Sequence, residues 1–549
     1  MGRLARWAVV FMCVCASVVV PASVVVGDAG AATVQVCPSG CAFSEIAPAI
    51  TAASSGDTIQ VAAGTYAGGF TIDKSVKLVG AGAGRTIISG GGPVITIGQI
   101  FAASEPTVSV DGVTITGGVT RSSPESVPCK GKADVWAAGG GIEVPPSTDF
   151  SGGGCNDFGG GAAVTITNSA ITGNRVAPSD SVPFPPCGGC PVGWAFGGGI
   201  DTSGSLTLTN TTVSDNLVGS AADTATTARF ADGGGVFSGR GDMTISNSQI
   251  SGNQVAISPH GVIADAGGIA FSVDTNGTPV AGGRFTMSNS SVSGNHATVI
   301  SDFGFGLVPS GAVHLKGGTQ SVSVTNSTIS DNVATITGSF GFTGADTGGF
   351  RADVCPPAPC TLANDTISGN SVHASASSGF VEGRSGAGEV GGTLTNDRIT
   401  GNSVDVSNAD GDARAIGGAS VFDSGTITNS VISNNRIHAA APLGAVDVRG
   451  GALNVFGPTM LRNSTISGTT VSVGGASGSA RGGGIFDGVN PDGPPGGPLA
   501  LQNSNLIGNV LSGSTGISLH GGGLYIESNP LTLINSLIAN NLPDQCFGC

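Results

Sequence analysis

A nine-residue motif recurs eleven times along this chain of 549 residues, and it restricts the possible folds more than any other feature. The motif runs apolar-x-Asn-Ser-x-Ile/Val-x-Gly/Asp-Asn, as in ITNSAITGN and ISNSQISGN. Successive copies lie 32 to 42 residues apart. Such spacing is typical of solenoids, in which each repeat buries its apolar side chains against its neighbours. The leading asparagines are Asn168, Asn210, Asn247, Asn289, Asn326, Asn364, Asn396, Asn429, Asn463, Asn503 and Asn535.

A second landmark precedes most copies: a glycine pair, a small residue and then an apolar residue, as in Gly197-Gly198-Gly199-Ile200. From Gly197 to Asn216 the unit is a compact 20 residues. The remaining 12 to 23 residues lie between the closing asparagine of one motif and the next landmark. Because length variation concentrates there, we expect loops on one side of the unit.

Apolar residues within the motif alternate with Ser and Thr, as in Leu206-Thr207-Leu208-Thr209. A period of two with β-branched side chains predicts strands, and no helical pattern separates them. The sequence therefore predicts an all-β fold, a single-stranded parallel β-helix in which each Ile or Val stacks on its equivalent in the next coil. We expect the recurrent asparagines to form a structural ladder, with stacked amides satisfying buried turn groups from coil to coil.

The ends of the chain differ from the repeats. Two arginines followed by an apolar run are typical of a secretory signal peptide, which predicts a secreted or cell-surface protein. A short capping helix is expected next, with Ser44 as its N-cap. The expected divisions are 1–32 signal peptide, 33–57 N-terminal cap, 58–549 β-helix, 58–120 irregular opening coils, and about 138–541 the eleven repeats, followed by a short C-terminal tail.

The stretch GDTIQVAAGTYAGGFTIDKSVKLVGAG, within residues 40 to 120, resembles the opening coils of the pectin-lyase-like superfamily. The resemblance implies a right-handed helix. The pairing of Gly-Gly-x-Ile with Ile/Val-x-x-Asn is also similar to the repeats of bacterial polymorphic outer-membrane proteins. Fold resemblance alone assigns no activity.

Cysteines outside the signal peptide number ten and fall into close pairs, which favours disulfides in an oxidising compartment. Zinc is the alternative for the two Cys-x-x-Cys pairs, although neither has a second Cys or His pair nearby. The expected disulfides are Cys37 with Cys41, Cys129 with Cys155, Cys187 with Cys190, Cys355 with Cys360, and Cys546 with Cys549.

A formal charge of −15 argues against binding to nucleic acid or to an anionic membrane surface, since both favour clustered Lys and Arg. After the first 32 residues no apolar run approaches the length of a membrane-spanning helix. We expect a monomeric protein without a transmembrane segment.

Familiar catalytic sets of the superfamily are missing. A polygalacturonase-like site would show Asn-x-Asp, Asp-Asp, Gly-His-Gly and Arg-x-Lys in order, and only the first occurs. Calcium remains possible as a cofactor, but no acidic cluster or Ca²⁺-binding repeat supports it, and no other metal site is expected.

The best candidate site lies where the first two repeats begin. Glu143 and Asp201 each follow a Gly-Gly-Gly-Ile landmark, so we expect them to be stacked neighbours and candidate catalytic carboxylates. Trp136 and Trp194 precede the same coils and are candidates for binding a sugar ring. The alternative is that both acids are solvated and both tryptophans pin long loops.

The sequence thus favours a secreted β-helix that binds extracellular polysaccharide or cell-surface ligands, because it has many repeats without a complete catalytic set. A divergent polysaccharide lyase or glycoside hydrolase using Glu143 and Asp201 is the alternative. A structural extracellular spacer is the third possibility.

Overall fold

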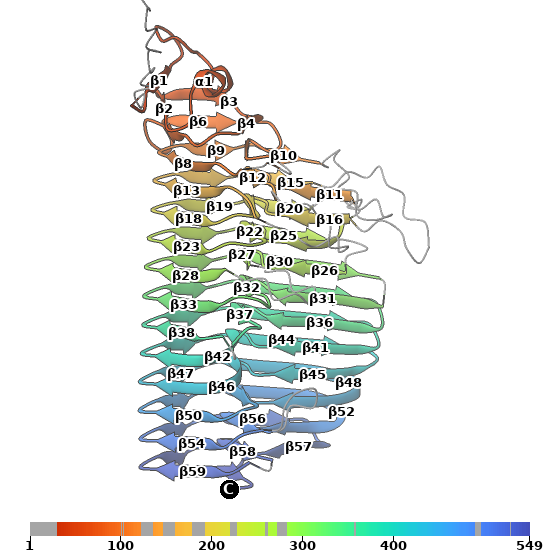
Figure 1. Cartoon of the computed structure of the whole chain (residues 1–549). Helices are drawn as coiled ribbons and strands as arrows, with labels where there is room; N and C mark the ends of the chain where they lie inside the picture. The colour runs from red at the N-terminus through yellow and green to blue at the C-terminus, as the bar shows by residue number, and fades with distance from the viewer. Residues whose placement is uncertain are drawn as a thin grey trace, which may run out of the picture.

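The protein is a parallel β-helix, in which strands of successive coils stack along one axis from the N-terminal to the C-terminal end (Figure 1). This architecture confirms the fold predicted from the repeat. The computed structural model describes residues 30–99, 102, 104–121, 135–146, 160–177, 193–219, 228–257, 262–271, 283–302, 304–355, 358–488, 496–527 and 529–549.

One coil shows the plan of the repeats. Strands β17 (Ile200–Thr202) and β18 (Leu206–Thr209) lie in one sheet, and β19 (Thr212–Ser214) lies in a second. Strand β20 (Leu217–Gly219) then runs outward from the main stack, and β21 (Ala228–Asp232) returns to it; both belong to a third sheet. Each strand pairs in parallel with its equivalents in the coils before and after it.

The main core consists of columns of inward-facing apolar side chains. Ile115, Ile171, Val213 and Ile250 are register partners in successive coils and are fully buried. Ser and Thr alternate with them and face outward, as the period of two predicted. Burying one such side chain contributes about 1.5–3 kcal/mol, so a continuous column stabilises each coil against its neighbours.

The N-terminal end is covered by helix α1 (Ile46–Ala52), whose Ile46, Ala49 and Ile50 are buried. The prediction of Ser44 as the N-cap is wrong. Glu45 is the N-cap residue; its backbone is extended, and its side chain makes no capping hydrogen bond. Burial of Ile46 and Ile50, rather than a cap, positions the helix. The opening strands are β1 (Thr33–Val36), β2 (Thr58–Val61), β3 (Gly64–Ala67), β4 (Phe70–Ile72), β5 (Lys77–Val79), β6 (Thr86–Ser89), β7 (Ile95–Ile97), β8 (Thr107–Asp111), β9 (Thr114–Thr116) and β10 (Val119–Thr120).

Segments expected to be loops on one side of the unit form strands instead. Outgoing and returning strands, such as β30 (His296–Ser301) and β31 (Phe305–Ser310), pack as two layers over a second apolar core. Most of its inward side chains are Ala or Val, such as Val299 and Ala345, and small side chains let the layers approach closely. We call this second stack, visible at the right of Figure 1, the side lobe.

Two asparagine columns have different roles. The leading asparagines, beginning with Asn168 and Asn210, adopt positive φ and are exposed, with side-chain bonds between some of them. The buried ladder expected for them is built instead by the closing asparagines. Asn216 Nδ2 donates to Asn253 Oδ1 at 2.9 Å, and Asn253 Nδ2 donates to Asn295 Oδ1 at 3.0 Å. A tight left-handed turn holds the leading residue outside, whereas the closing residue points into the coil.

Three of the expected disulfides are present: Cys37–Cys41, Cys355–Cys360 and Cys546–Cys549. Cys129, Cys155, Cys187 and Cys190 lie outside the described residues. Among the helices that the structure describes, none is long and apolar enough to cross a membrane.

Candidate functional site

The side lobe meets the main stack along a corner that runs parallel to the helix axis. A glycine turn joins each returning lobe strand to the next strand of the main sheet; at Gly197, φ is 59° and an added Cβ would lie 2.4 Å from the Ile200 carbonyl oxygen. The returning strands are β11 (Val135–Ala138), β16 (Gly193–Phe196), β21, β26 (Ile263–Asp265), β31, β36 (Phe342–Thr347), β41 (Phe380–Arg384), β45 (Asp412–Ile416), the ends of β48 (Arg436–Arg449) and β52 (Thr470–Arg481), and β57 (Ile517–His520). The strands after the turn include β12 (Ile142–Val144), β17, β22 (Val236–Ser238), β27 (Ile269–Phe271), β32 (Val313–Leu315), β37 (Phe350–Ala352), β42 (Gly388–Thr395), β53 (Ile485–Asp487) and β58 (Leu524–Ile526).

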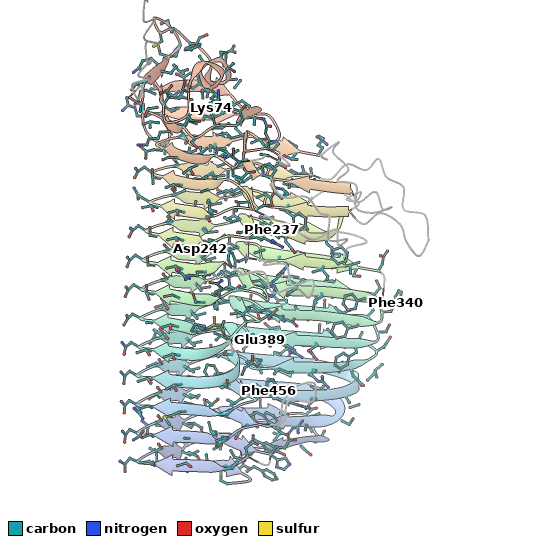
Figure 2. All side chains as sticks on the ribbon, viewed as in Figure 1. Lys74, Phe237, Asp242, Phe340, Glu389 and Phe456 are labelled. Carbon is teal, nitrogen blue, oxygen red and sulfur yellow. A yellow bond between two sulfur atoms is a disulfide. The ribbon has the colours of Figure 1, made fainter. Side chains whose placement is uncertain are left out.

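Outward-facing side chains of the two strand sets contact each other across this corner. The rings of Phe196, on β16, and Phe237, on β22, lie 4.5 Å apart between centroids. In Figure 2, Phe237 and Glu389 lie between the two stacks, whereas Phe340 projects at the outer edge of the lobe. The corner therefore collects side chains from both stacks.

The predicted carboxylates occupy the N-terminal part of the corner. Glu143 and Asp201 are register partners on β12 and β17, so they are stacked neighbours as expected. Asp201 is buried, which contradicts the solvated alternative, and its Oδ1 has no hydrogen-bond partner among the described residues. Burial, aided by the charge of Glu143, raises the pKa of Asp201 well above its usual range. The pair thus combines one carboxyl that favours the protonated form with a second carboxylate beside it.

Trp136 and Trp194 are also register partners, on β11 and β16. Both strands return to the corner immediately before the turns that lead to Glu143 and Asp201. The side chains of both tryptophans lie outside the described residues, so their contact with the acids stays a prediction.

A buried charge cluster lies in the coils that follow, from Asp232 on β21 to Asp353 just after β37. His314 Nδ1 lies 2.6 Å from Asp265 Oδ2, and its Nε2 lies 2.9 Å from Asp353 Oδ2. Lys316 Nζ bridges Asp232 at 2.8 Å and Asp265 at 3.0 Å. Burial lowers the pKa of His314, but the two carboxylates outweigh burial and raise it. The same cations hold the pKa of Asp265 well below its usual range despite burial.

This cluster continues as ion pairs between the lobe and the main stack. Arg351 contacts Asp346 and lies 3.8 Å from Glu389. Arg384 Nη1 lies 3.9 Å from Glu389 across the corner, and its Nε bonds Glu382 of the same lobe strand at 2.6 Å. Burial raises the pKa of Glu389 more strongly than its arginine neighbours lower it. Removing one partner of a buried ion pair leaves an uncompensated charge in the interior. This part of the corner therefore mainly stabilises the packing of the lobe against the main stack.

An aromatic ladder runs along the outer face of the returning lobe strands. Phe305, Phe342 and Phe380 are stacked, with centroids 5.6 and 6.0 Å apart and interplanar angles of 20° and 24°. Phe305 is 42% exposed. The Arg414 guanidinium lies 5.2 Å from the Phe380 centroid. The ladder thus offers a partly exposed apolar strip with a cation at one end.

A pocket of about 340 Å³ opens beside the last ring of this ladder. It is lined by the aromatic and charged side chains of Phe380, Arg414, Asp412, Asp447 and Arg481, together with Ala, Val, Gly and Ser residues. Arg481 donates to Asp447 at 2.6 Å, and Arg414 Nε lies 3.6 Å from the same carboxylate. The pocket combines an aromatic wall, two guanidinium groups and two carboxylates.

A second aromatic stack continues beyond the pocket. Phe486, Tyr525 and Phe547 have centroids 5.4 and 5.0 Å apart and nearly parallel rings. Arg481 lies over both Phe486 and Tyr525, at 5.3 and 5.7 Å from their centroids. Arg481 therefore links the pocket to this second stack. We call the first ladder, the pocket and the second stack together the aromatic track.

The aromatic track was missed in the sequence. Phe305, Phe342 and Phe380 each stand five residues before a turn whose first residue is Ser310, Thr347 or Ser385, respectively. Aligning the repeats on that turn, rather than on the Gly-Gly landmark alone, would have placed the three rings in one column. No group of three or more His, Cys, Asp or Glu within the described ranges is arranged to hold a metal ion.

Comparisons with known proteins give no family for the chain. No family model and no curated protein matches it. Among solved structures, the A-module of mannuronan C-5 epimerase AlgE4 of Azotobacter vinelandii aligns at 13% identity, over 91% of this chain and 93% of that one, with a TM-score of 0.28. The A-module of AlgE6 from the same organism aligns at 14% identity, over 89% and 92%, with a TM-score of 0.30. The PL6 family alginate lyase AlyGC aligns at 10% identity, over 91% and 100%, with a TM-score of 0.15.

Proposed function

We propose that this protein binds an extracellular polysaccharide along the aromatic track. The observation that carries the proposal is the ladder of Phe305, Phe342 and Phe380 leading into the pocket beside Arg414 and Arg481. The stacked rings form an apolar strip against which the C–H face of a sugar ring can pack, while guanidinium and carboxylate groups bond its hydroxyl groups. A ligand with both kinds of surface matches this combination.

The solenoid geometry suits a chain ligand. The rings on successive coils have centroids 5.6 and 6.0 Å apart, so they present similar contacts at regular intervals. A polymer with a regular repeat gains from several such contacts at once, although each one alone is weak. The protein acts outside the cell in this proposal, since the three disulfides within the described residues suit an oxidising compartment.

A pair of substitutions tests the track directly. Phe342→Ala removes the central ring, and Phe340→Ala is the matched control, because Phe340 is 53% exposed but lies at the lobe edge outside the ladder. Affinity electrophoresis in gels containing alginate, polygalacturonate, xylan or a soluble glucan measures retardation. We expect Phe342→Ala to weaken binding about 2- to 10-fold, since ring stacking contributes about 0.5–1.5 kcal/mol. Retardation by none of the four, or equal loss in both variants, would contradict the proposal.

A second candidate function is polysaccharide cleavage by Glu143 and Asp201. The observation favouring it is the buried Asp201 carboxyl beside Glu143, with a raised pKa suited to a general acid. Glu143→Gln and Asp201→Asn should each abolish cleavage of the bound polysaccharide, measured as new reducing ends. Asp410→Asn, at an exposed lobe turn, is the control and should cleave normally. Unchanged cleavage in both site variants would remove the pair from any mechanism.

A further inference from the structure

The column that carries the first aromatic ladder continues into a carboxylate. Phe305 is the register partner of Phe342, Phe342 that of Phe380, and Phe380 that of Asp412. Asp412 is exposed, and it lines the pocket together with Phe380. Parallel strands of neighbouring coils lie about 4.8 Å apart. A sugar ring packed on Phe380 therefore meets the Asp412 carboxylate directly beside it.

Asp412 is held in position but has no cation beside it. Its Oδ1 accepts a hydrogen bond from the Ala445 N–H at 2.8 Å, which restrains the side chain. No basic side chain within the described ranges forms an ion pair with it, and its Oδ2 accepts no hydrogen bond there. The pocket thus presents an uncompensated negative charge with a free acceptor oxygen.

The two arginines of the pocket already face carboxylates. Arg414 Nη1 lies 3.1 Å from Glu382, and its Nε lies 3.6 Å from Asp447. Arg481 Nη2 lies 2.6 Å from Asp447, and its Nη1 lies 3.8 Å from Glu527. An acidic ligand would have to compete with these carboxylates for either guanidinium.

The next arginines around the pocket are paired as well. Arg449 Nη2 lies 2.9 Å from Asp447, and Arg384 Nε lies 2.6 Å from Glu382. Both acids are therefore shared between arginines, and neither arginine leaves a positive charge without a carboxylate beside it. Asp412 is the charged group of the pocket that lacks an opposite charge.

We propose that the pocket takes an uncharged sugar and that Asp412 determines this specificity. The inference rests on the proposed binding along the aromatic track. A carboxylate accepts strong hydrogen bonds from sugar hydroxyl groups, whereas the carboxylate of a uronic acid beside Asp412 meets a like charge. The ligand class is thus a neutral polysaccharide with free hydroxyl groups, and polyuronates bind more weakly.

Two pairs of polymers test the specificity, because the members of each pair share a backbone and differ in charge. One pair is polygalacturonate and its full methyl ester, and the other is a soluble glucan before and after oxidation of C6 to the carboxylate. Affinity electrophoresis at low ionic strength gives the dissociation constants. We expect the neutral member to bind about 3- to 10-fold more tightly, as for two like charges roughly 5 Å apart near a protein surface. The preference should shrink at about 1 M salt, where the Debye length is about 3 Å.

Asp412→Asn assigns the preference to one residue. The amide keeps an oxygen for the Ala445 N–H and removes the charge, so thermal unfolding should not change. We expect the ratio of the dissociation constants of the acidic and neutral members to fall about 3- to 10-fold. Asp410→Asn is the matched control, since it makes the same charge change at an exposed lobe turn outside the pocket, and it should leave the ratio unchanged.

The outcomes separate this inference from the proposed function. Tighter or equal binding of the acidic members, or the same change of ratio in both variants, would overturn the specificity of Asp412. Binding along the track would still stand if Phe342→Ala weakened it. Retardation of wild type by no polysaccharide at all would overturn both.

Discussion

Asp365 and Asp397 are stacked neighbours inside the helix wall, where the backbone N–H of Asp365 donates to Asp397 Oδ1 at 2.9 Å. The same column carries Ser290 and Ser327 before them and Ser430 after them. Both carboxyls are buried. Burial, together with the neighbouring Asp397 charge, raises the pKa of Asp365 to about 7, and burial raises that of Asp397 to about 6.

This pair predicts that stability falls as pH rises. The pKa values of both carboxyls in the folded protein lie above the value of about 3.9 in the unfolded chain. The contribution of the pair to stability is therefore complete below about pH 3.9 and is lost as the pH rises through 6 and 7. Asp365→Ser/Asp397→Ser restores the hydroxyl column and should reduce the loss between pH 5 and pH 8 by roughly 1–3 kcal/mol. Urea unfolding at the two pH values measures it, and an identical pH dependence in wild type and variant would refute this explanation.

The buried asparagine ladder has a gap at Thr469. Its backbone N–H donates to Asn509 Oδ1 at 3.1 Å, but its Oγ1 has no hydrogen-bond partner among the described residues. Thr469→Asn should join Asn435 to Asn509 and raise the free energy of unfolding by about 1 kcal/mol. Thr469→Val removes the hydroxyl without adding an amide. If the valine variant is as stable as the asparagine variant, ladder completion is not the cause.

His314 should stabilise the protein most at low pH. Its pKa is raised in the folded protein, so its contribution is present below about pH 6.5 and is lost as pH rises through the raised value. His314→Gln leaves Asp265 with Lys316 as its cation and should lower the free energy of unfolding by roughly 2–4 kcal/mol at pH 6. His373→Gln, an exposed histidine 3.6 Å from Asp405, is the comparison and should change stability little. Equal losses in the two variants would argue against a special role for the buried cluster.

Much of the fold follows from periodicity. Every copy of the motif places an Ile, Val or Leu at the same offset from its asparagines, so stacking of Ile171 on Val213 could be predicted without a structure. The same reasoning placed Glu143 beside Asp201, because each of them directly follows a Gly-Gly-Gly-Ile landmark. Spacing within a coil is sufficient where a residue lies at a fixed distance from a landmark of the repeat, whatever the length of the coil.

The side lobe could not be predicted in this way. Its strands lie in the segment of variable length, and its core uses small residues such as Ala231 and Ala264 that carry a weak hydrophobic pattern. Only where the outgoing strand is long, as in the alternation of Ala297 and Val299, does a period of two show clearly. The charged contacts across the corner join residues far apart in sequence, such as Lys316 and Asp232, which spacing alone does not relate.

Hydrogen–deuterium exchange of the chain with and without the polysaccharide reports which coils the ligand contacts, and it therefore tests binding along the aromatic track. We predict slower exchange in β36, β41 and β45, which carry Phe342, Phe380 and Arg414, and no change at the N-terminal cap. Protection confined to β12 and β17 around Glu143 and Asp201, with none along the aromatic track, would contradict the account and favour the cleavage site instead.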